Sequence, residues 1–256
     1  NDITLTTTDS NITFGSTVDG DGTARDLTLT LGSGSASVTG IVGATSLDVL
    51  TLNSSASFTA AVTATSIVNA ATKTATFSDA VTANITNAGT LLFNTSTNKS
   101  VTGTISEGDG TTEIQVMDSA DGAPATVTFT GTVAADTLTV GTSSKAGAAL
   151  FQEAVTVPTI TITGGNVDAE DSTVTFNKAV TSSTGITLDD NTGDAKIIFA
   201  QNNSVTIAGT IDGASANEGT LQITGTLKTF SGAVGNTYRI NVLDINAATS
   251  FSSSVA

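Results

Sequence analysis

A long pattern recurs about two and a half times along this chain, and it limits the fold more than any single residue does. Its occurrences share an apolar residue, several small residues, a Val, a strand-like stretch and then Phe-x-x-x-Val; they span Ser37–Val62, Thr128–Val155 and Lys228–Val255. Matching positions lie about a hundred residues apart, as Phe129 and Phe230 do. Repetition on this scale is typical of proteins that stack one supersecondary unit many times.

A shorter period of apolar anchors, mostly near twenty residues, is nested inside the long one. In the clearest unit, Val127–Val140, Val127 and Phe129 alternate with Thr and therefore face the same side of a strand. Leu138 and Val140 form a second alternating pair. We expect the same arrangement in two further units, Val174, Phe176, Val180, Ile186 and Leu188, and Val205, Ile207, Ile211, Leu221 and Ile223.

A unit of two or three short strands, each apolar on one side only, cannot bury that side alone. Successive units bury it if the chain winds into a coil and each strand stacks on its counterpart one turn below. We therefore predict an all-β parallel β-solenoid, with coils of about 20–25 residues nested in the repeat of about 100 residues. Residues 1–256 would form one continuous solenoid of about a dozen coils, with Phe stacked on Phe inside. Because the chain begins at Asn1 and stops inside a repeat, we expect a mature chain or an excerpt of a longer repetitive protein.

A tandem array of immunoglobulin-like sandwiches is the alternative architecture, because it would also repeat near a hundred residues. Such a domain closes about seven strands on themselves, usually around a core Trp. This chain has no Trp, and its shorter period runs across every candidate boundary. Both observations favour the solenoid.

The composition supports strands and excludes several classes of partner. Thr is abundant, and Thr and Val favour pleated, half-buried surfaces. The net charge of −15 argues against nucleic acids and anionic membranes, whose recognition needs clustered Lys and Arg. No apolar run of about eighteen residues is present, so we expect no direct membrane span in this chain. The absence of Cys excludes disulfides.

Four short strings carry a resemblance to the repeats of large bacterial surface proteins: Ile12–Gly22 (ITFGSTVDGDG), Val127–Val133 (VTFTGTV), Val205–Gly213 (VTIAGTIDG) and Thr229–Gly235 (TFSGAVG). On these strings the chain resembles filamentous-haemagglutinin-like proteins, autotransporter passenger domains and repetitive S-layer proteins. The resemblance implies a secreted β-helix that serves at the cell surface as a shaft, a coat or an adhesin. Because the strings are of low complexity, they indicate a broad class of repetitive proteins rather than an individual protein.

The residue types that most catalytic sites need are absent or scattered. Without His or Cys there is no partner to activate a nucleophile and no zinc ligand set. Hydrolysis of sugars needs paired carboxylates in a cleft, whereas the acidic residues here fall mainly at predicted turns. The only two Arg, Arg25 and Arg239, lie in separate segments. We therefore expect no enzymatic activity, and no catalytic or cofactor-binding residues.

Two clusters of Asp in Gly-containing turns are the candidate metal ligands. Asp19 and Asp21 flank a Gly in the first cluster, and Asp189, Asp190 and Asp194 form the second. Oxygen-rich turns of this kind can hold Ca²⁺, although neither cluster has the spacing of an EF-hand or of the Gly-rich calcium repeats. The alternative is that Asp and Gly only form tight, solvated corners. Calcium is the only cofactor that the sequence suggests.

The expected function is mechanical. We predict a non-catalytic structural segment of an exported, extracellular bacterial surface protein, acting as a shaft, a surface-layer unit or a filament protomer. Because the ends of a solenoid expose unpaired strand edges, we expect self-association, end to end or in a lattice. The alternative is an adhesin module that binds a glycan or a cell-surface protein, for which a long loop with aromatic residues would be the sign. The only Tyr, Tyr238, does not form such a platform.

Overall fold

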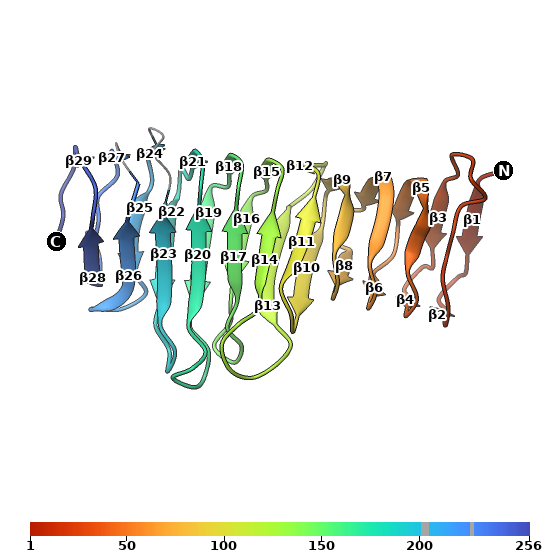
Figure 1. The fold of residues 1–256 in the computed structure, drawn as a ribbon, viewed down its shortest axis with the longest axis horizontal. Helices are drawn as coiled ribbons and strands as arrows, with labels where there is room; N and C mark the ends of the chain where they lie inside the picture. Colours follow the sequence, from red (N-terminus) through yellow and green to blue (C-terminus); the bar gives the residue numbers. More distant parts are fainter. Residues whose placement is uncertain (201–204, 226–227) are drawn as a thin grey trace.

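The chain winds into a rod made of about ten turns of about 23 residues each. This computed structural model describes residues 1–200, 205–225 and 228–256, and every pairing between two strands in them is parallel. Figure 1 shows the two termini at opposite ends of the elongated molecule. The predicted parallel β-solenoid is confirmed. The sandwich alternative was wrong, because sandwiches are built from antiparallel sheets.

Each coil has three faces, which the chain visits in a fixed order. The first face holds β1 (Ile3–Thr6), β3 (Leu27–Thr30), the ends of β5 (Val42–Leu52), β7 (Val62–Asn69) and β9 (Val81–Asn87), and β12 (Ile105–Glu107), β15 (Val133–Ala134), β18 (Val155–Thr156), β21 (Val180–Thr181), β24 (Val205–Ile207), β27 (Lys228–Phe230) and β29 (Thr249–Phe251). The second face holds β2 (Ile12–Phe14), β4 (Ala36–Val38), β6 (Ala56–Phe58), β8 (Thr74–Phe77), β10 (Thr90–Thr95), β13 (Glu113–Asp118), β16 (Thr137–Val140), β19 (Thr159–Thr163), β22 (Gly185–Asp189) and β25 (Thr210–Gly213). The third face holds the beginnings of β5, β7 and β9, and then β11 (Lys99–Thr102), β14 (Thr126–Phe129), β17 (Ala148–Phe151), β20 (Ser172–Phe176), β23 (Ala195–Phe199), β26 (Glu218–Ile223) and β28 (Ile240–Ile245).

Strict alternation along the strands sends every second side chain into the rod. In β14 the pattern is clear: Val127 and Phe129 are buried, whereas Thr126 and Thr128 are half-buried on the outer surface. The burial of β20 and β26 alternates in the same way. Because identical strand positions stack in parallel register, the buried side chains form columns that run along the rod. No helix in the described residues is long and apolar enough to cross a membrane.

Two of these columns run through the whole length of the rod. On the second face one column joins Ile12 in the first coil to Val255 in the last, through the aligned residues Ala36, Ala56, Ala75, Leu91, Ile114, Leu138, Ile160, Ile186, Ile211 and Val234. On the third face the other joins Val18 to Ile245, through Val42, Val62, Val81, Val101, Phe129, Phe151, Phe176, Phe199 and Ile223. We call them the second-face column and the third-face column.

The Phe rings form one continuous stack that changes face twice. Phe58, Phe77 and Phe93 lie on the second face, with ring centroids 5.3 and 5.6 Å apart and nearly parallel planes. The next ring, Phe129, lies on the third face, 5.2 Å from Phe93 and at 88° to it. Stacked rings continue along the third face as far as Phe199. The perpendicular pair therefore marks the change of face.

A second change of face takes the stack from the third face to the first. Phe199 and Phe230 are 5.7 Å apart with an interplanar angle of 74°, and Phe251 then stacks on Phe230 at 5.1 Å. The two largest sequence separations between neighbouring rings of this stack, Phe93 to Phe129 and Phe199 to Phe230, coincide with the two changes of face. Over each of these separations the chain completes one full coil and then continues to the next face.

Residues at matching positions of the long sequence repeat therefore lie on successive faces of the coil and not on the same face. From Phe93 the second face passes through four further coils before the third face brings in Phe199. The unit expected at Val205 is affected, because β24, β25 and β26 lie on the first, second and third faces, whereas β14, β15 and β16 lie on the third, first and second. The expected burial of Ile207, Ile211, Leu221 and Ile223 is confirmed, but this unit begins one face further along the coil than the unit at Val127.

On the first face, one row of stacked inward-facing side chains changes from apolar residues to two hydrogen-bonded Asn residues. Asn69 and Asn87 are aligned and buried, and the Asn69 Nδ2 atom donates to Asn87 Oδ1 at 2.9 Å. Asn87 Nδ2 donates in turn to the carbonyl of Gly89 at 2.8 Å. These bonds supply partners for backbone groups at the corner between the first and second faces, which a buried corner otherwise leaves unpaired.

Candidate functional site

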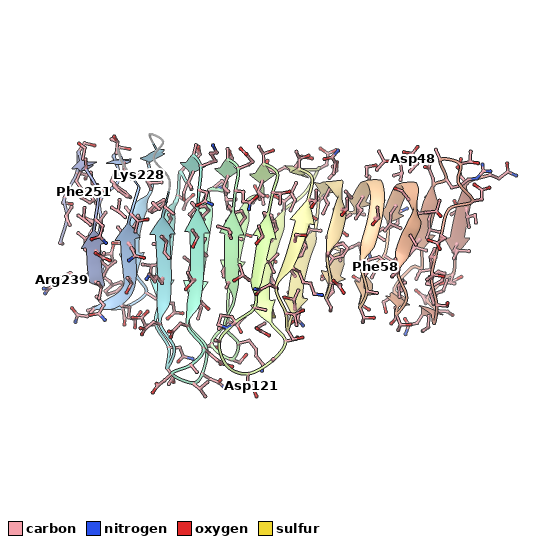
Figure 2. The ribbon with its side chains drawn as sticks, viewed as in Figure 1. Asp48, Phe58, Asp121, Lys228, Arg239 and Phe251 are labelled. Atoms are coloured by element: carbon pink, nitrogen blue, oxygen red, sulfur yellow. The ribbon has the colours of Figure 1, made fainter. Side chains whose placement is uncertain are left out.

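The regular winding is interrupted most at the corner between the second and third faces. Four loops of neighbouring coils are stacked there, residues 119–125, 141–147, 164–171 and 190–194. Figure 1 shows loops of this region hanging below the rod, and Figure 2 shows Asp121 near their lowest edge. We call these four loops, with the flanking Asp118 and Asp189, the acidic corner. This is the place where the chain departs from a plain shaft.

Carboxylates at the acidic corner close its turns by accepting backbone N–H groups. Asp190 accepts from Ala195 at 2.7 Å and, across to the next coil, from Gly219 at 2.7 Å. Asp171 accepts the backbone N–H of Asp194 at 2.9 Å. Such bonds satisfy donors that the strands leave free at their ends. Two of these three bonds join different coils, so the acidic corner is fixed coil to coil.

Polar side chains also connect the loops directly. Lys145 forms an ion pair with Asp121 of the preceding coil, and this hydrogen bond raises the pKa of the Lys145 ammonium. The Asn191 side-chain amide donates to the carbonyl of Ser143 at 2.7 Å, two coils away. Gly141 adopts a positive φ of 76°, and a Cβ there would overlap the carbonyl of Thr163, so glycine is required for the loops to pack this closely.

Negative charge accumulates where the acidic corner meets β22. Burial raises the pKa of Asp189, and the like charges of Glu218 and Asp190 raise it further. Burial also raises the pKa of Asp194, with Asp190 as the largest of the like charges. The folded chain therefore holds carboxylates here that repel one another, which disfavours their ionised form.

The other predicted cluster lies at a different corner near the N-terminus. Asp21 forms an ion pair with Arg25, whose NH2 group lies 2.8 Å from the carboxylate, and accepts the Thr23 N–H at 3.1 Å. The hydrogen bond from Arg25 holds the pKa of Asp21 far below its usual range. Asp19 accepts the backbone N–H of Thr45 at 3.1 Å. Both carboxylates thus have protein partners.

The structure brings Asp189, Asp190 and Asp194 into one neighbourhood and leaves Asp19 and Asp21 apart from them. In the described part of the chain no three acidic side chains converge in the way a metal centre requires. Calcium binding stays a prediction, and it is tested by comparing melting temperatures with Ca²⁺ and with chelator.

One buried acid was not anticipated from the sequence. Glu170 is 1% exposed, and its Oε2 accepts the backbone N–H of Asn166 at 3.0 Å, whereas its Oε1 has no hydrogen-bond partner in the structure. Nothing in the sequence distinguishes this Glu from the neighbouring loop acids. Its burial follows from Gly165, whose missing side chain leaves room for the Glu170 carboxylate.

A groove of about 550 Å³ lies on the third face next to the acidic corner. Its floor comes from β14, β17 and β20, where the aligned residues Thr126, Ala148 and Thr173 point outward. The small side chain of Ala148 lowers the floor between the two Thr. Residues of the loops 119–125 and 164–171 complete the lining. The volume is within the range of ligand sites, but the lining is mostly small and apolar.

Comparisons with known proteins give no relative from which a role could be transferred. A scan against protein-family models, a search of curated proteins and a search of solved structures each returned no match. The sequence and the geometry of this chain are therefore the only basis for assigning it a role.

Proposed function

We propose that this chain is a non-catalytic structural segment of an exported bacterial cell-surface protein, in which it acts as a stiff rod. The observation that carries the proposal is the pair of unbroken apolar columns, from Ile12 to Val255 and from Val18 to Ile245. At roughly 4.8 Å per turn, about ten turns extend roughly 50 Å. A fold in which each coil stacks chiefly on its two neighbours is elongated along one axis, which is the shape that a shaft needs.

The outer surface supports a role outside the cell. Its strand positions are rich in hydroxyl side chains, as at Thr137, Thr139, Thr159 and Thr161. The net charge of −15 favours solubility, because neighbouring copies repel one another. The resemblance to bacterial surface repeats points the same way. A surface without His, Cys or Trp offers little for catalysis and suits a covering or a spacer.

Antibodies raised against residues 1–256 test this proposal in the source organism. Immunogold labelling of intact cells is expected to place the protein at the cell periphery, and external protease is expected to remove it. An antibody against a cytoplasmic protein is the control for cell integrity. Labelling confined to the interior of opened cells would contradict the proposal.

An adhesin module is the second candidate, and the groove beside the acidic corner is the observation that favours it. Leu150 lines the groove and is half-buried on the outer side of β17. If the groove binds a glycan, Leu150→Arg is expected to abolish binding on a glycan array or to whole cells. Thr181→Arg, on the exposed first face, is the matched control. Equal binding by both variants would remove the groove from consideration.

A further inference from the structure

We propose that the groove beside the acidic corner binds an extended, positively charged peptide segment of a partner protein. A Lys or Arg side chain of that segment is held between the loops 119–125 and 164–171, which we call the wall loops. The inference goes beyond the role as a rod and rests on the second candidate function, because it names the partner of that groove. Three properties of the groove support it: its width, the rigidity of its walls and its charge.

The first property is the width of the groove, which leaves space for one extended chain. Its floor residue Ala148 lies between Thr126 and Thr173, which belong to the coils before and after it. Two steps of roughly 4.8 Å place these two Thr roughly 10 Å apart. Leu150, the next outward residue of β17, continues the lining in the strand direction. Every second side chain of an extended segment that follows this direction faces the floor.

The lining fits a side chain that has an apolar stem and a charged end. Ala123, Pro124, Ala148 and Leu150 contribute apolar groups, and Asp171 contributes a carboxylate. Lys and Arg carry methylene stems that pack against apolar surface while the charged end reaches a polar partner. An acidic side chain in the same place would meet Asp171 as a like charge.

The second property is that both wall loops are fixed without a ligand. In the first wall loop the carboxylate of Asp118 accepts the backbone N–H groups of Ala120 at 2.7 Å and Ala125 at 2.5 Å, which ties the two ends of the loop together. In the second wall loop Gly165 donates its backbone N–H to the carbonyl of Glu170 at 2.8 Å. Because these walls are already in place, little conformational entropy is lost from them on binding.

The third property is an excess of negative charge around the groove. The acidic corner contains eight carboxylates and a single cation, Lys145, which is paired with Asp121. Burial raises the pKa of Asp194, and like charges that include Asp171 of the groove lining raise it further. Carboxylates that repel one another are stabilised by an approaching cation. The charge of the acidic corner is therefore complementary to a basic segment.

The buried Glu170 places a further oxygen without a partner next to the same wall. It lies in the chain between Ala169 and Asp171, which both line the groove, and its Oε1 has no hydrogen-bond partner in the structure. Lys196 is aligned with Thr173 in the next coil and lies outside the lining. The charge of the groove itself thus comes from a carboxylate.

Fluorescence anisotropy with labelled octapeptides tests the inference on the whole chain of residues 1–256. The probe alternates Lys with Ala, and its two controls alternate Ser with Ala and Glu with Ala, so that only the charge of every second residue differs. We expect the Lys peptide to bind and the two controls not to bind. The affinity for the Lys peptide is expected to fall as salt rises, because salt screens the attraction.

Three substitutions separate the groove from a general attraction to an acidic protein. Ala148→Thr fills the groove above its floor without changing the charge, and we expect it to weaken binding at least about tenfold. Asp171→Asn removes a charge but keeps an oxygen for the Asp194 N–H, and we expect binding about two- to fivefold weaker. Asp48→Asn removes the same charge far from the acidic corner (Figure 2), and it is expected to bind like the parent.

Four outcomes overturn the inference. They are the absence of binding by the Lys peptide, equal binding of the Ser peptide, unchanged binding by Ala148→Thr, and equal effects of Asp171→Asn and Asp48→Asn. Circular dichroism checks that each variant is folded, and the comparison of the two Asp variants decides if Ala148→Thr is not. A chain that labels the cell surface without binding the Lys peptide rejects this partner and leaves the proposed function intact.

Discussion

Single residues in this protein are sorted by the alternation of side chains along each strand. Phe129 is 1% exposed and lies between Phe93 and Phe151 in the ring stack, whereas Thr128, next to it, faces outward. Phe129→Asp removes a large apolar side chain and buries a charge, so we expect it to cost at least about 4 kcal/mol. In a chain of this size that lowers the melting temperature by roughly 10 °C or more.

The neighbouring Thr128→Lys is the matched control, and we expect it to change stability by less than about 0.5 kcal/mol. Thermal melts followed by circular dichroism measure both. Equal damage from the two variants would show that the assigned inward side of β14 is wrong.

The side of each strand that faces the interior was predictable from the sequence, because the alternation of inward and outward side chains is a local and strict pattern. Val127 and Phe129 alternate with Thr in four consecutive residues, and the structure buries them as expected. The role of Glu170 was not predictable, because its burial depends on the stacking of a loop against its neighbours and not on its sequence context. The acids at the corner were predicted to lie in turns, but their bonds from coil to coil, such as Asp190 to Gly219, follow only from the stacking register.

Among the strands and their corners, the change of face by the Phe stack is the feature with the sharpest energetic consequence. Val116 stacks on Phe93 on the second face, in the coil where Phe129 takes the ring to the third. We expect Val116→Phe alone to overpack the interior by about 1–3 kcal/mol. Phe129→Val alone is expected to cost about 2–4 kcal/mol by leaving a cavity.

The double variant is expected to cost less than the sum of the two by at least about 0.5 kcal/mol, because one ring replaces the other beside Phe93. Val38→Phe, far from Phe129 on the second face, gives the control cycle with Phe129→Val. Urea unfolding measures each value. Strict additivity in the first cycle would show that the two faces do not share this space.

The signal for this change was present in the sequence but was ambiguous. The wide gaps from Phe93 to Phe129 and from Phe199 to Phe230 can be interpreted as an inserted loop or as a step of one face. Only the pairing of Val101 with Phe129 distinguishes the two. For the same reason the sequence alone did not show that the unit at Val205 begins on a different face from the unit at Val127.

The acidic corner gives a prediction for pH dependence. The pKa of Asp189 is raised in the folded chain, so the contribution of this group is most favourable below its unfolded value and is lost as pH rises through the folded value. Because solvent screens this partly exposed group, we expect Asp189→Asn to stabilise the protein at pH 7 by no more than roughly 0.5 kcal/mol, or about 1–2 °C.

The same substitution is expected to have no effect near pH 3, where the Asp is already protonated. Melting temperatures at the two pH values test this, and Asp21→Asn is the contrasting variant. The pKa of Asp21 is lowered by Arg25, so its carboxylate stabilises the fold above the unfolded pKa and this contribution is lost as pH falls through the folded value. Destabilisation by Asp189→Asn at pH 7 would contradict the assigned repulsion.

On the scale of the whole molecule, uncompensated charge opposes the compact rod. The described residues contain three ion pairs, Arg25 with Asp21, Lys99 with Asp79 and Lys145 with Asp121, against a net charge of −15. Raising the salt concentration from about 0.01 to 1 M shortens the Debye length from roughly 30 to 3 Å. We expect the melting temperature to rise by several degrees, because screened repulsion outweighs three weakened pairs.

Differential scanning calorimetry at low protein concentration checks this without interference from assembly. Sucrose at matched osmolality is the control for effects of excluded solute. A melting temperature that falls with salt would show that attractive pairs dominate the electrostatics of the rod.

Each long repeat begins one face further around the coil than the repeat before it, and this has a consequence for variants that differ in length. Removing or duplicating one such repeat shortens or lengthens the rod by whole turns plus roughly a third of a turn. Everything downstream is then rotated about the long axis, so the acidic corner and its groove point in a new direction relative to the N-terminal end. Three long repeats must be gained or lost together before the downstream coils regain their original orientation about the long axis. The length of the rod and the direction in which its downstream surface points therefore change together.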